Sequence, residues 1–532
     1  MYLKDKKQRI NFLLLSTLLL GAALRIYNLG KNSLWADEAG FIIFKSGNLL
    51  SSLRYILRGL LRGELDPCHH GYRIFSTVWS SFSSNEFMLR LSSVIFGVIS
   101  IFYIYKLGKI LFSKEVGLIS AFILSISPFH IYYSQEFRMY TLITLLTIAT
   151  AYCLKKFLES GKKEFLFGYV ITHAFNIWLH MITVLVLIAE NIFFVCYYNR
   201  YRNLLRKWLK AHLIILLFVM PEIIFLVLHL KNNPIRGVLS STISTVSVLG
   251  HISPIIPLYS LKNFSAGYNV GLTIWLPIFI LFVVLFIFGI IKTKTRQELN
   301  LCLFGLFIPI IILYLFQKYL YADRFLIPSS IFFYLIVANG LYYLKKPLFI
   351  FTLIVISCLY LPPLSNYYKG YLPCPLEQRI AVHYKRPHRE AASFVLKNYQ
   401  KGDIIFHTDP NTALPFEYYF NLYFQENKNK KTKFARNQIR LILRFSKNNT
   451  EPLPYDFWTR GRFRDLSDIV SVKNHKRVWL VFSAREFTEA NQPGSPERRI
   501  VAWMDKHYIK KDVKEFKRII VLLYTSPDKE IN

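Results

Sequence analysis

The segment LISAFILSISPFHIYYSQEFRMYTLITLL, residues 118–146, joins two apolar runs with hardly any loop between them. Gln135, Glu136 and Arg138 lie at the junction. An apolar run of about 20 residues is long enough to cross a bilayer as a helix. Charged groups this close to the hydrocarbon core are rare and usually have a function. The segment predicts two transmembrane helices whose connection carries functional side chains, although Glu136 and Arg138 could also pair only to stabilise the turn.

Similar apolar runs recur from residue 10 to residue 363. The chain is 53% hydrophobic and only 18% charged, whereas soluble proteins have about a quarter charged residues. The first run lacks a small-residue cleavage site, so we interpret it as a retained span. Only Leu179 and His180 separate the fifth run from the sixth. We expect a multi-span helical membrane protein with about eleven spans, close to residues 10–29, 88–112, 116–133, 138–158, 164–180, 181–199, 210–230, 271–291, 300–319, 325–344 and 347–363.

Clusters of Lys and Arg occupy every second connection of this scheme, within residues 4–9, 106–114, 155–163, 200–210, 292–296 and 345–346. Positively charged loops stay in the cytoplasm. We therefore expect an integral protein of the plasma (inner) membrane, with a cytoplasmic N-terminus and an extracytoplasmic C-terminal domain. The formal net charge of +34 does not favour nucleic acid as a partner, because much of it lies at bilayer surfaces and would meet membrane lipids.

The chain then divides into a transmembrane domain, residues 1–363, with a long outer segment at 30–87, and an extracytoplasmic domain, residues 364–532. In the second domain, predicted helices at 389–399 and 496–506 alternate with apolar strands at 403–407, 477–482 and 518–524. This alternation is typical of a small α/β domain. Cys68 and Cys374 would share the outer compartment and could form a disulfide. No spacing in the sequence resembles a zinc site.

The outer segment begins with SLWADEAGF, residues 33–41, which places Asp37 and Glu38 just beyond the first span. Two compatible interpretations are open. Asp37 could cap a helix that starts at Glu38. Asp37 could also be a general base at the water-facing mouth of a membrane cavity, where it would take a proton from an acceptor hydroxyl or amine.

A basic amphipathic helix is predicted next, in LLSSLRYILRGLLRG, residues 49–63. Arg54, Arg58 and Arg62 recur every four residues and form one stripe beside leucines, as in helices that lie in the membrane interface. The arginines either snorkel to lipid phosphates or attract an anionic lipid substrate.

Two further outer turns carry candidate binding groups. QKYLYADRFLIPSS, residues 317–330, contains Lys318 and Arg324, which either bind a phosphate or anchor helix ends. His180, in WLHMITVL, is either an interfacial histidine or a site residue. The sequence has neither a Walker A string nor a GxGxxG that opens a helix after a strand, which favours a lipid-linked substrate over a nucleotide.

These segments, in this order, resemble integral-membrane glycosyltransferases of the GT-C fold, in the group of protein O-mannosyltransferases and aminoarabinose lipid A transferases (glycosyltransferase family 39-like). LWADEA is similar to the acidic motif of the family's first outer loop, and YYSQEFRMY to its YSQEARMY string. NEFMLRLSSVIFGVISIFYIYKLGKILF resembles the family's second span, LHMITVLVLIAE its THYFALLVLLAQ segment and ADRFLIP its Arg-aromatic-Leu string. The resemblance covers residues 1–345 well and the tail only in architecture.

The resemblance implies transfer of a sugar from a polyprenyl-phosphate donor, on the outer face, to a protein, lipid or envelope-glycan acceptor, with inversion. Asp37 would be the base, and Glu38 and Glu136 would shape the site or bind sugar hydroxyls. No cofactor is required, although a divalent metal near Asp37 is an option. The expected substrate-binding residues are Arg138, Arg324, Lys318, His180, Tyr133 and Gln135.

One stretch departs from the family pattern. Family members usually have a His-Pro-Pro-Leu string after the interface helix, where this chain has CHHGYRIF, residues 68–75. His69 and His70 then occupy the proline positions. The departure bears on donor or acceptor specificity, so both histidines are candidate binding residues.

A transporter or flippase of lipid-linked sugars is the alternative from another class. It should show two repeated halves and spans broken by Gly or Pro at the midplane. The sequence indicates neither feature. Its acidic groups gather at the outer ends of spans, which suits chemistry at one face of the membrane.

Overall fold

The computed structural model describes residues 6–43, 49–62, 69–232, 256–316, 323–371, 385–400, 402–407, 410–426, 475–483 and 496–527. The chain separates into two compact units. The first comprises residues 1–29, 67–75 and 87–384, and the second comprises residues 30–66, 76–86 and 385–532. Most of the outer segment therefore belongs to the same unit as the C-terminal part of the chain.

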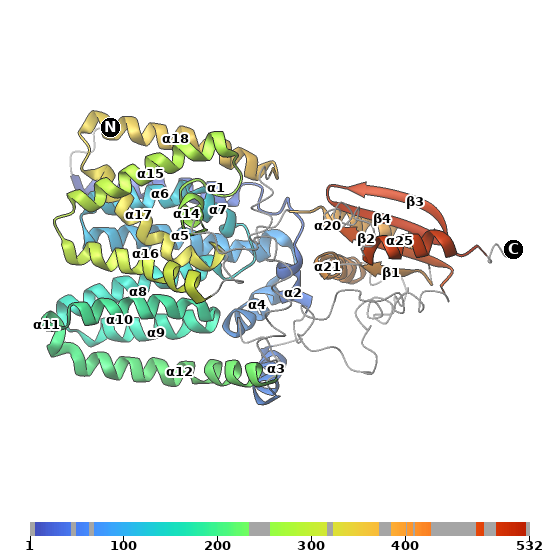
Figure 1. The fold of residues 1–532 in the computed structure, drawn as a ribbon, viewed down its shortest axis with the longest axis horizontal. Coiled ribbons are helices and arrows are strands. Elements are labelled where there is room, and N and C mark those ends of the chain that lie inside the picture. The colour runs from blue at the N-terminus through green and yellow to red at the C-terminus, as the bar shows by residue number, and fades with distance from the viewer. Residues whose placement is uncertain are drawn as a thin grey trace. The chain divides into compact units, whose positions relative to one another are not determined.

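The first unit is a bundle of helices (Figure 1). Helix α4 (His70–Phe82) begins in this unit and ends in the second one. The other described helices of the bundle are α1 (Lys6–Ile26), α5 (Glu86–Leu111), α6 (Lys114–Ile126), α7 (Pro128–Ser134), α8 (Tyr140–Ser160), α9 (Lys163–Leu179), η1 (Met181–Thr183), α10 (Val184–Cys196), α11 (Tyr198–Tyr201), η2 (Arg202–Leu204), α12 (Leu205–Asn232), α14 (Ile256–Ala266), α15 (Leu272–Lys292), α16 (Arg296–Phe316), η4 (Asp323–Leu326), α17 (Ile327–Tyr342) and α18 (Lys346–Tyr368).

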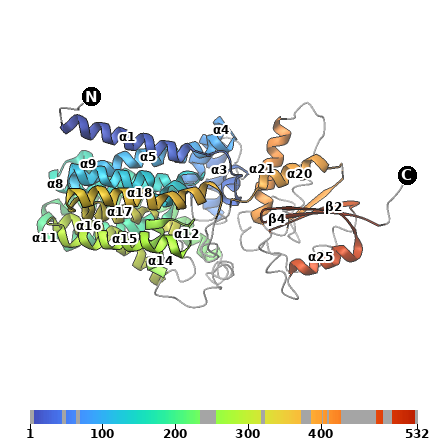
Figure 2. The same cartoon turned by 90° about the horizontal axis from the view of Figure 1, so that it is seen from above.

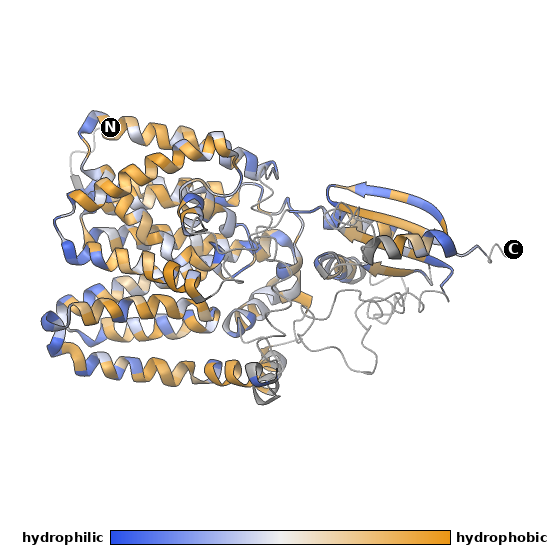
Figure 3. Cartoon of the chain, viewed as in Figure 1, coloured by the Kyte–Doolittle hydropathy of each residue, from blue (hydrophilic) through white to orange (hydrophobic). Residues whose placement is uncertain are grey.

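All eleven predicted spans fall on helices, which confirms the expected multi-span helical fold. Figure 3 shows that these helices are apolar along most of their length. Within the described ranges, eight helices are long and apolar enough to cross a membrane, or nine if the bent pair α6–α7 counts as one span. The other two predicted spans, at 164–180 and 181–199, correspond to helices shorter than this limit, because the chain turns at residues 180–183. That turn leaves α9 with 17 residues and α10 with 13.

The third predicted span is broken, which the sequence analysis did not anticipate. Helices α6 and α7 meet at an angle of 60°. Proline disfavours helical backbone in the residue before it, and Ser127, before Pro128, has a ψ of 117°. The buried guanidinium of Arg25 donates to the carbonyls of Leu124 and Ser125 at 2.9 and 2.8 Å. These bonds satisfy carbonyl groups next to the break, which water could not reach inside a membrane.

Two glycines allow α15 and α17 to pack closely. A Cβ atom on Gly340 would collide with the carbonyl oxygen of Leu285, and one on Gly289 with the carbonyl oxygen of Ile336. Small residues at such contacts are common in membrane bundles, where close van der Waals packing drives helix association. Helix α17 is buried over nearly its whole length and forms the centre of the bundle.

The second unit contains a four-stranded sheet, which confirms the predicted C-terminal α/β fold. The strands are β1 (Ile404–His407), β2 (Arg477–Ser483), β3 (Ile509–Phe516) and β4 (Ile519–Thr525), in the order β1-β2-β4-β3. Strand β1 pairs with β2 in parallel, and the other pairs are antiparallel. Helices α20 (His388–Asn398) and α21 (Pro410–Glu426) cover one face of the sheet and α25 (Pro496–His507) the other (Figure 2).

Two elements of this domain were not predicted. Strand β3 reads IKKDVKEF and is exposed along nearly all its length, so it shows no apolar run. Lysines on such an edge strand discourage pairing with another chain. Helix α21 contains Pro415, which obscures a helical pattern in the sequence.

The outer segment supplies α2 (Ala36–Ile43) and α3 (Leu49–Arg62) to the second unit. The predicted helix at 49–63 is therefore present. Leu50, Leu53 and Leu57 are exposed on α3, as expected of a helix in the membrane interface. Arg54 is exposed, and the side chains of Arg58 and Arg62 lie outside the described part of the structure.

Candidate active site

His180 lies at the turn that ends α9. Its Nδ1 accepts a hydrogen bond from the backbone N–H of Ile182 at 3.2 Å. A ring nitrogen that accepts does not carry the proton, so the imidazole is neutral and protonated at Nε2. This Nε2 is buried and has no hydrogen-bond partner among the described residues. His180 therefore presents an N–H donor that a ligand could use.

His69 packs against His180. The two rings meet edge to face, with their centroids 4.6 Å apart. His69 has a φ of 78°, a left-handed conformation that is uncommon outside glycine and clusters at functional sites. Burial lowers the pKa of His69 well below its usual value, and the neighbouring His180, Arg138 and Arg324 lower that pKa further. His69 is therefore neutral at pH 7.

Arg138 is held by the turn between α7 and α8. The Ser93 hydroxyl of α5 donates to the carbonyls of Glu136 and Arg138 at 2.6 and 3.3 Å. The guanidinium lies over the ring of Tyr140, 5.6 Å from its centroid. Arg138 is buried, so its charge is poorly screened by water and acts strongly on its neighbours.

Arg324 is positioned by the residue before it. Asp323 is buried and accepts hydrogen bonds from Ser260 and from Asn263, the latter at 2.5 Å, and both partners belong to α14. These bonds fix η4 to α14. The ring of the adjacent Phe325 packs against that of His180, with their centroids 5.1 Å apart. The Arg324 guanidinium lies over the Phe325 ring, 5.2 Å from its centroid.

The structure thus brings together four residues from four separate segments, which we call the His–Arg cluster: His69, Arg138, His180 and Arg324. Two guanidinium groups and a neutral N–H donor suit an anion with several acceptor oxygens, such as a phosphate. All four were predicted as binding residues. The prediction of Arg138, His180 and Arg324 rests on their positions at outer turns, and that of His69 on the departure from the family pattern.

His70 has a partner that the sequence analysis missed. Its Nδ1 lies 2.9 Å from both carboxylate oxygens of Glu222 on α12, and both side chains are buried. The ring of His70 stacks on Phe225 at 4.2 Å. A carboxylate within a long apolar run was the available signal, since such residues usually face the bundle interior and pair there. Its partner, His70, is brought to it only by the packing of the helices.

Three predicted residues near Arg138 have protein partners. Gln135 donates from Nε2 to the carbonyls of Arg25 and Tyr27 at 2.9 and 2.7 Å, at the end of α1. The Tyr133 hydroxyl lies 2.7 Å from that of Tyr268. Glu136 is buried and hydrogen-bonded to the side chain of Tyr132. These contacts account for the burial of all three without a substrate, and their predicted substrate roles stay predictions.

Asp37 and Glu38 belong to the second unit. The predicted cap at Asp37 is wrong, because α2 begins earlier, at Ala36. Glu38 makes the capping bond instead: its Oε2 accepts from the backbone N–H of Trp35 at 3.3 Å, as the third helical residue does in a capping box. Glu38 is fully buried, whereas Asp37 is partly exposed. Asp37 is therefore the more accessible carboxylate.

Some predictions lie outside the described residues. These are Lys318 and the possible Cys68–Cys374 disulfide. Within the described ranges, no group of three or more His, Cys, Asp or Glu side chains could hold a metal ion.

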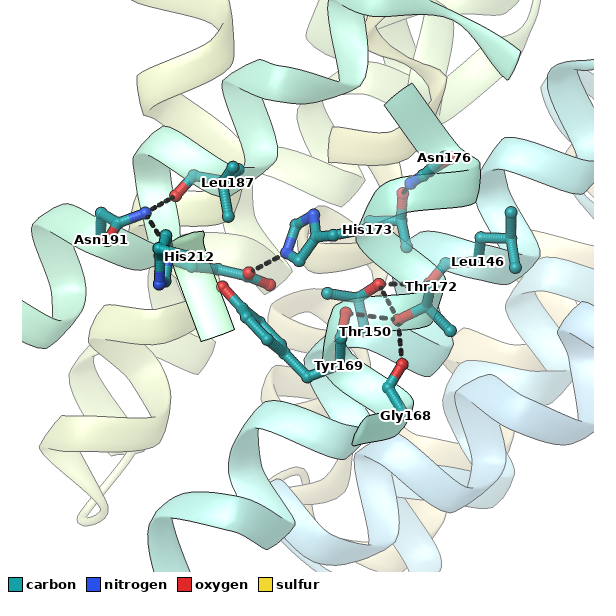
Figure 4. A network of polar contacts seen from close by, with 12 residues as sticks. Leu146, Thr150, Gly168, Tyr169, Thr172, His173, Asn176, Leu187, Asn191 and His212 are labelled. Carbon is teal, nitrogen blue, oxygen red and sulfur yellow. Dashed lines mark hydrogen bonds and ion pairs between the residues drawn. The ribbon is translucent and has the colours of Figure 1, made fainter. Parts of the chain in front are cut away.

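A second polar network, which is partly buried, joins helices of the bundle (Figure 4). His173 Nε2 lies 2.6 Å from Glu190 Oε2, which joins α9 to α10. Thr150 donates to Thr172 at 2.8 Å, which joins α8 to α9. Asn191 and His212 join α10 to α12 at 2.9 Å. Hydrogen bonds of this kind hold membrane helices in register, so we interpret this network as structural.

Residues 73–225 match the family model of dolichyl-phosphate-mannose-protein mannosyltransferases. This stretch includes Arg138, His180 and Glu222, but neither Asp37 nor Arg324. A search of the curated proteins finds no match.

Two solved structures align with nearly the whole chain. ArnT from Cupriavidus metallidurans in the apo state aligns with a TM-score of 0.54 and 10% identity, over 98% of each chain. ArnT from the same organism, bound to undecaprenyl phosphate, aligns with a TM-score of 0.52 and 11% identity, again over 98% of each chain. At these identities the alignments establish a shared fold.

Proposed function

Because the chain has the fold of the GT-C integral-membrane glycosyltransferases, we propose that it is a membrane glycosyltransferase that moves a sugar from a polyprenyl-phosphate donor to an acceptor. The observation that carries the proposal is the His–Arg cluster, which suits the phosphate of such a donor. The name of the matching family model and the undecaprenyl phosphate bound to ArnT support the donor class. The acceptor is a protein, a lipid or an envelope glycan. No cofactor takes part in the proposed reaction.

The proposed reaction is a displacement at the anomeric carbon. The acceptor oxygen forms the new bond to this carbon, and the bond from the carbon to the phosphate oxygen breaks, so the configuration inverts. The electron pair leaves with the lipid phosphate, which Arg138 and Arg324 stabilise electrostatically and to which His180 donates from Nε2. A phosphate needs cations more than a general acid as it leaves. The acceptor proton passes to Asp37.

The other acidic residues have supporting roles in this proposal. The capping bond of Glu38 holds the first turn of α2, which carries Asp37. Glu136 lies two residues before Arg138, and its bond with Tyr132 fixes the turn that carries this arginine. Arg138 and Arg324 are therefore proposed as binding residues, and Glu38 and Glu136 as residues that shape the site.

The test uses the purified full chain in lipid nanodiscs with a panel of synthetic undecaprenyl-phosphate hexoses and pentoses, and an extract of envelope material as acceptor. Release of undecaprenyl phosphate measures turnover. The Asp37→Asn variant should lose at least about 100-fold in turnover, because a general base contributes that much, while its affinity for undecaprenyl phosphate stays unchanged. Asp512→Asn, on the exposed edge strand β3, is the matched control and should keep full activity.

Two results would contradict the proposal. Full activity of Asp37→Asn would remove Asp37 from the base role. A wild-type protein that consumes no member of the panel, yet moves these lipids across a reconstituted bilayer, would favour the transporter. The second measurement is needed because the break between α6 and α7 is a feature that transporters also have.

A further inference from the structure

Helices α20 and α21 of the C-terminal domain hold the two ends of the outer segment. Arg389 on α20 donates from Nε to Glu86 Oε1 at 2.9 Å, and its terminal nitrogen lies 2.6 Å from the same oxygen. That nitrogen also donates to the carbonyl of Gly30 at 3.1 Å. Gly30 is the first residue of the outer segment, and Glu86 is the last residue of the part of this segment that belongs to the second unit. One arginine therefore ties both ends of the segment together.

Tyr419 on α21 makes a parallel connection. Its hydroxyl accepts a hydrogen bond from the backbone N–H of Leu34 at 2.8 Å and donates to Glu86 Oε1 at 2.9 Å. Tyr419, Leu34 and Glu86 are all buried. Buried bonds of this kind are costly to lose, since the remaining partner stays desolvated and unsatisfied.

Ser33 completes the connection from the other side. Its hydroxyl accepts from the backbone N–H of Arg389 at 3.1 Å and donates to Glu390 Oε2 at 3.3 Å. Residues 30–34 and residue 86 are thus bound by one continuous set of hydrogen bonds from α20 and α21. We call this set the tail clamp: Gly30, Ser33, Leu34, Glu86, Arg389, Glu390 and Tyr419.

The tail clamp ends three residues before Asp37. Leu34 and Trp35, which precede α2, are buried, as are Ala36, Ala39 and Phe41 within it, and α2 packs against α21. The entry to α2 is therefore fixed by backbone and side-chain bonds to the C-terminal domain, and its apolar face is fixed by packing. The partly exposed Asp37 projects from an element whose position the C-terminal domain determines.

We propose that the C-terminal domain is a positioning domain for the acidic helix α2, and that Arg389 and Tyr419 are positioning residues for Asp37. The proposal rests on the proposed function of Asp37 as the base. A base must be held close to its productive geometry, and an error of about 1 Å costs on the order of 100-fold in rate. The tail clamp supplies that constraint within the second unit, which gives the C-terminal domain a role in catalysis through the position of Asp37.

The experiment compares Tyr419→Phe with Tyr524→Phe in the full chain. The first substitution removes the hydroxyl that Leu34 and Glu86 share. The second removes a hydroxyl that donates to Asp505 at 2.8 Å within the same domain and that makes no described contact with the outer segment. Ser33→Ala is a second clamp variant with little effect on volume. Amide hydrogen exchange over residues 34–43 is measured for each, together with kcat and KM for the panel lipid that the wild type consumes.

Tyr419→Phe and Ser33→Ala should speed amide exchange over residues 34–43 about tenfold, which corresponds to about 1.4 kcal/mol, and leave exchange in β2 and β4 unchanged. They should lower kcat about tenfold and leave KM unchanged, because the donor phosphate is bound elsewhere. Tyr524→Phe should change neither kcat nor exchange over residues 34–43. Unchanged exchange in both clamp variants, or faster exchange with full kcat, would overturn the proposal. Activity in Asp37→Asn would instead overturn the role of Asp37, whatever the exchange data show.

Discussion

The structure defines which ring nitrogen of His180 carries the proton. Its Nδ1 accepts a backbone N–H, so only Nε2 can donate to a phosphate. Replacing His180 with Phe should weaken binding of undecaprenyl phosphate by about 10-fold to 100-fold, the usual cost of a hydrogen bond to a charged group. Replacing it with Gln, which keeps an N–H donor, should cost no more than about threefold. Equilibrium binding of undecaprenyl phosphate to the protein in nanodiscs measures both.

The matched control for this prediction is His173→Gln. His173 lies on α9, about two turns before His180, which caps this helix. Its side chain pairs with Glu190 in the structural network. This variant should lower the unfolding temperature and leave the affinity for undecaprenyl phosphate unchanged. An unchanged affinity in His180→Phe would show that the Nε2 proton does not meet the lipid phosphate.

At the residue scale, the sequence predicted which residues belong to the site better than it predicted which residues they contact. Arg138, His180 and Arg324 could be chosen because each interrupts an apolar run at a predicted outer turn, and the structure places them in one cluster. Gln135 has the same position in the sequence pattern, yet its side chain bonds to the end of α1. The pairs His70–Glu222 and His173–Glu190 join residues 152 and 17 positions apart. Such pairings depend on helix packing, which a single sequence does not encode locally.

At the scale of elements, the contact between α15 and α17 gives a direct test of the packing. Gly340→Ala would place a methyl group against the carbonyl oxygen of Leu285. We expect a loss of about 1–3 kcal/mol in the free energy of unfolding, as for other overpacked contacts, read as a lower unfolding temperature in detergent. Gly271→Ala is the control, because a Cβ atom there meets nothing within 4 Å. Equal unfolding temperatures for the two variants would contradict this account of the contact.

Helix existence could be predicted from the apolar runs, whereas helix interruption could not. The run through residues 116–133 is continuous in hydropathy, and Pro128 alone does not reveal a 60° bend. Prolines also lie inside α12, α15 and α16, which the structure keeps as single helices. Whether a proline breaks a membrane helix depends on groups that satisfy the freed carbonyls. Here that group is Arg25, about 100 residues away in the sequence.

At the scale of the whole molecule, the fold class and the nature of both units were predictable from apolar periodicity. The assignment of the outer segment was not. The described residues of 30–66 and 76–86 belong to one unit with those of 385–532, and polar side chains of α20 and α21 bind this segment. A single polar residue such as Arg389 or Tyr419 forms no sequence pattern from which a distant partner could be predicted. The predicted boundary between the transmembrane and extracytoplasmic domains, at residue 363, stays a prediction.

The orientation of the first unit in the membrane can be predicted from the positions of its basic connections. The basic connections at 155–163, 200–210 and 292–296 meet at one end of the first unit. Lys155 lies 2.5 Å from Glu298, at the start of α16, and Lys207 donates to the carbonyl of Gly161 at 2.9 Å. Figure 2 shows the beginning of α1 and α11 at this same end. Because basic loops stay in the cytoplasm, this end should be cytoplasmic and the opposite end extracytoplasmic.

Alkaline phosphatase, which is active only outside the cytoplasm, tests this orientation when it is fused after Asn532 in a bacterial inner membrane. We expect high activity there and none when the enzyme is fused after Gly161, which caps the C-terminus of α8 at the basic end. The opposite pattern would place Asp37 and the C-terminal domain in the cytoplasm. The proposed transfer would then have to take place on the inner face, where a nucleotide sugar could compete as donor, so the orientation decides which donor pool the His–Arg cluster can meet.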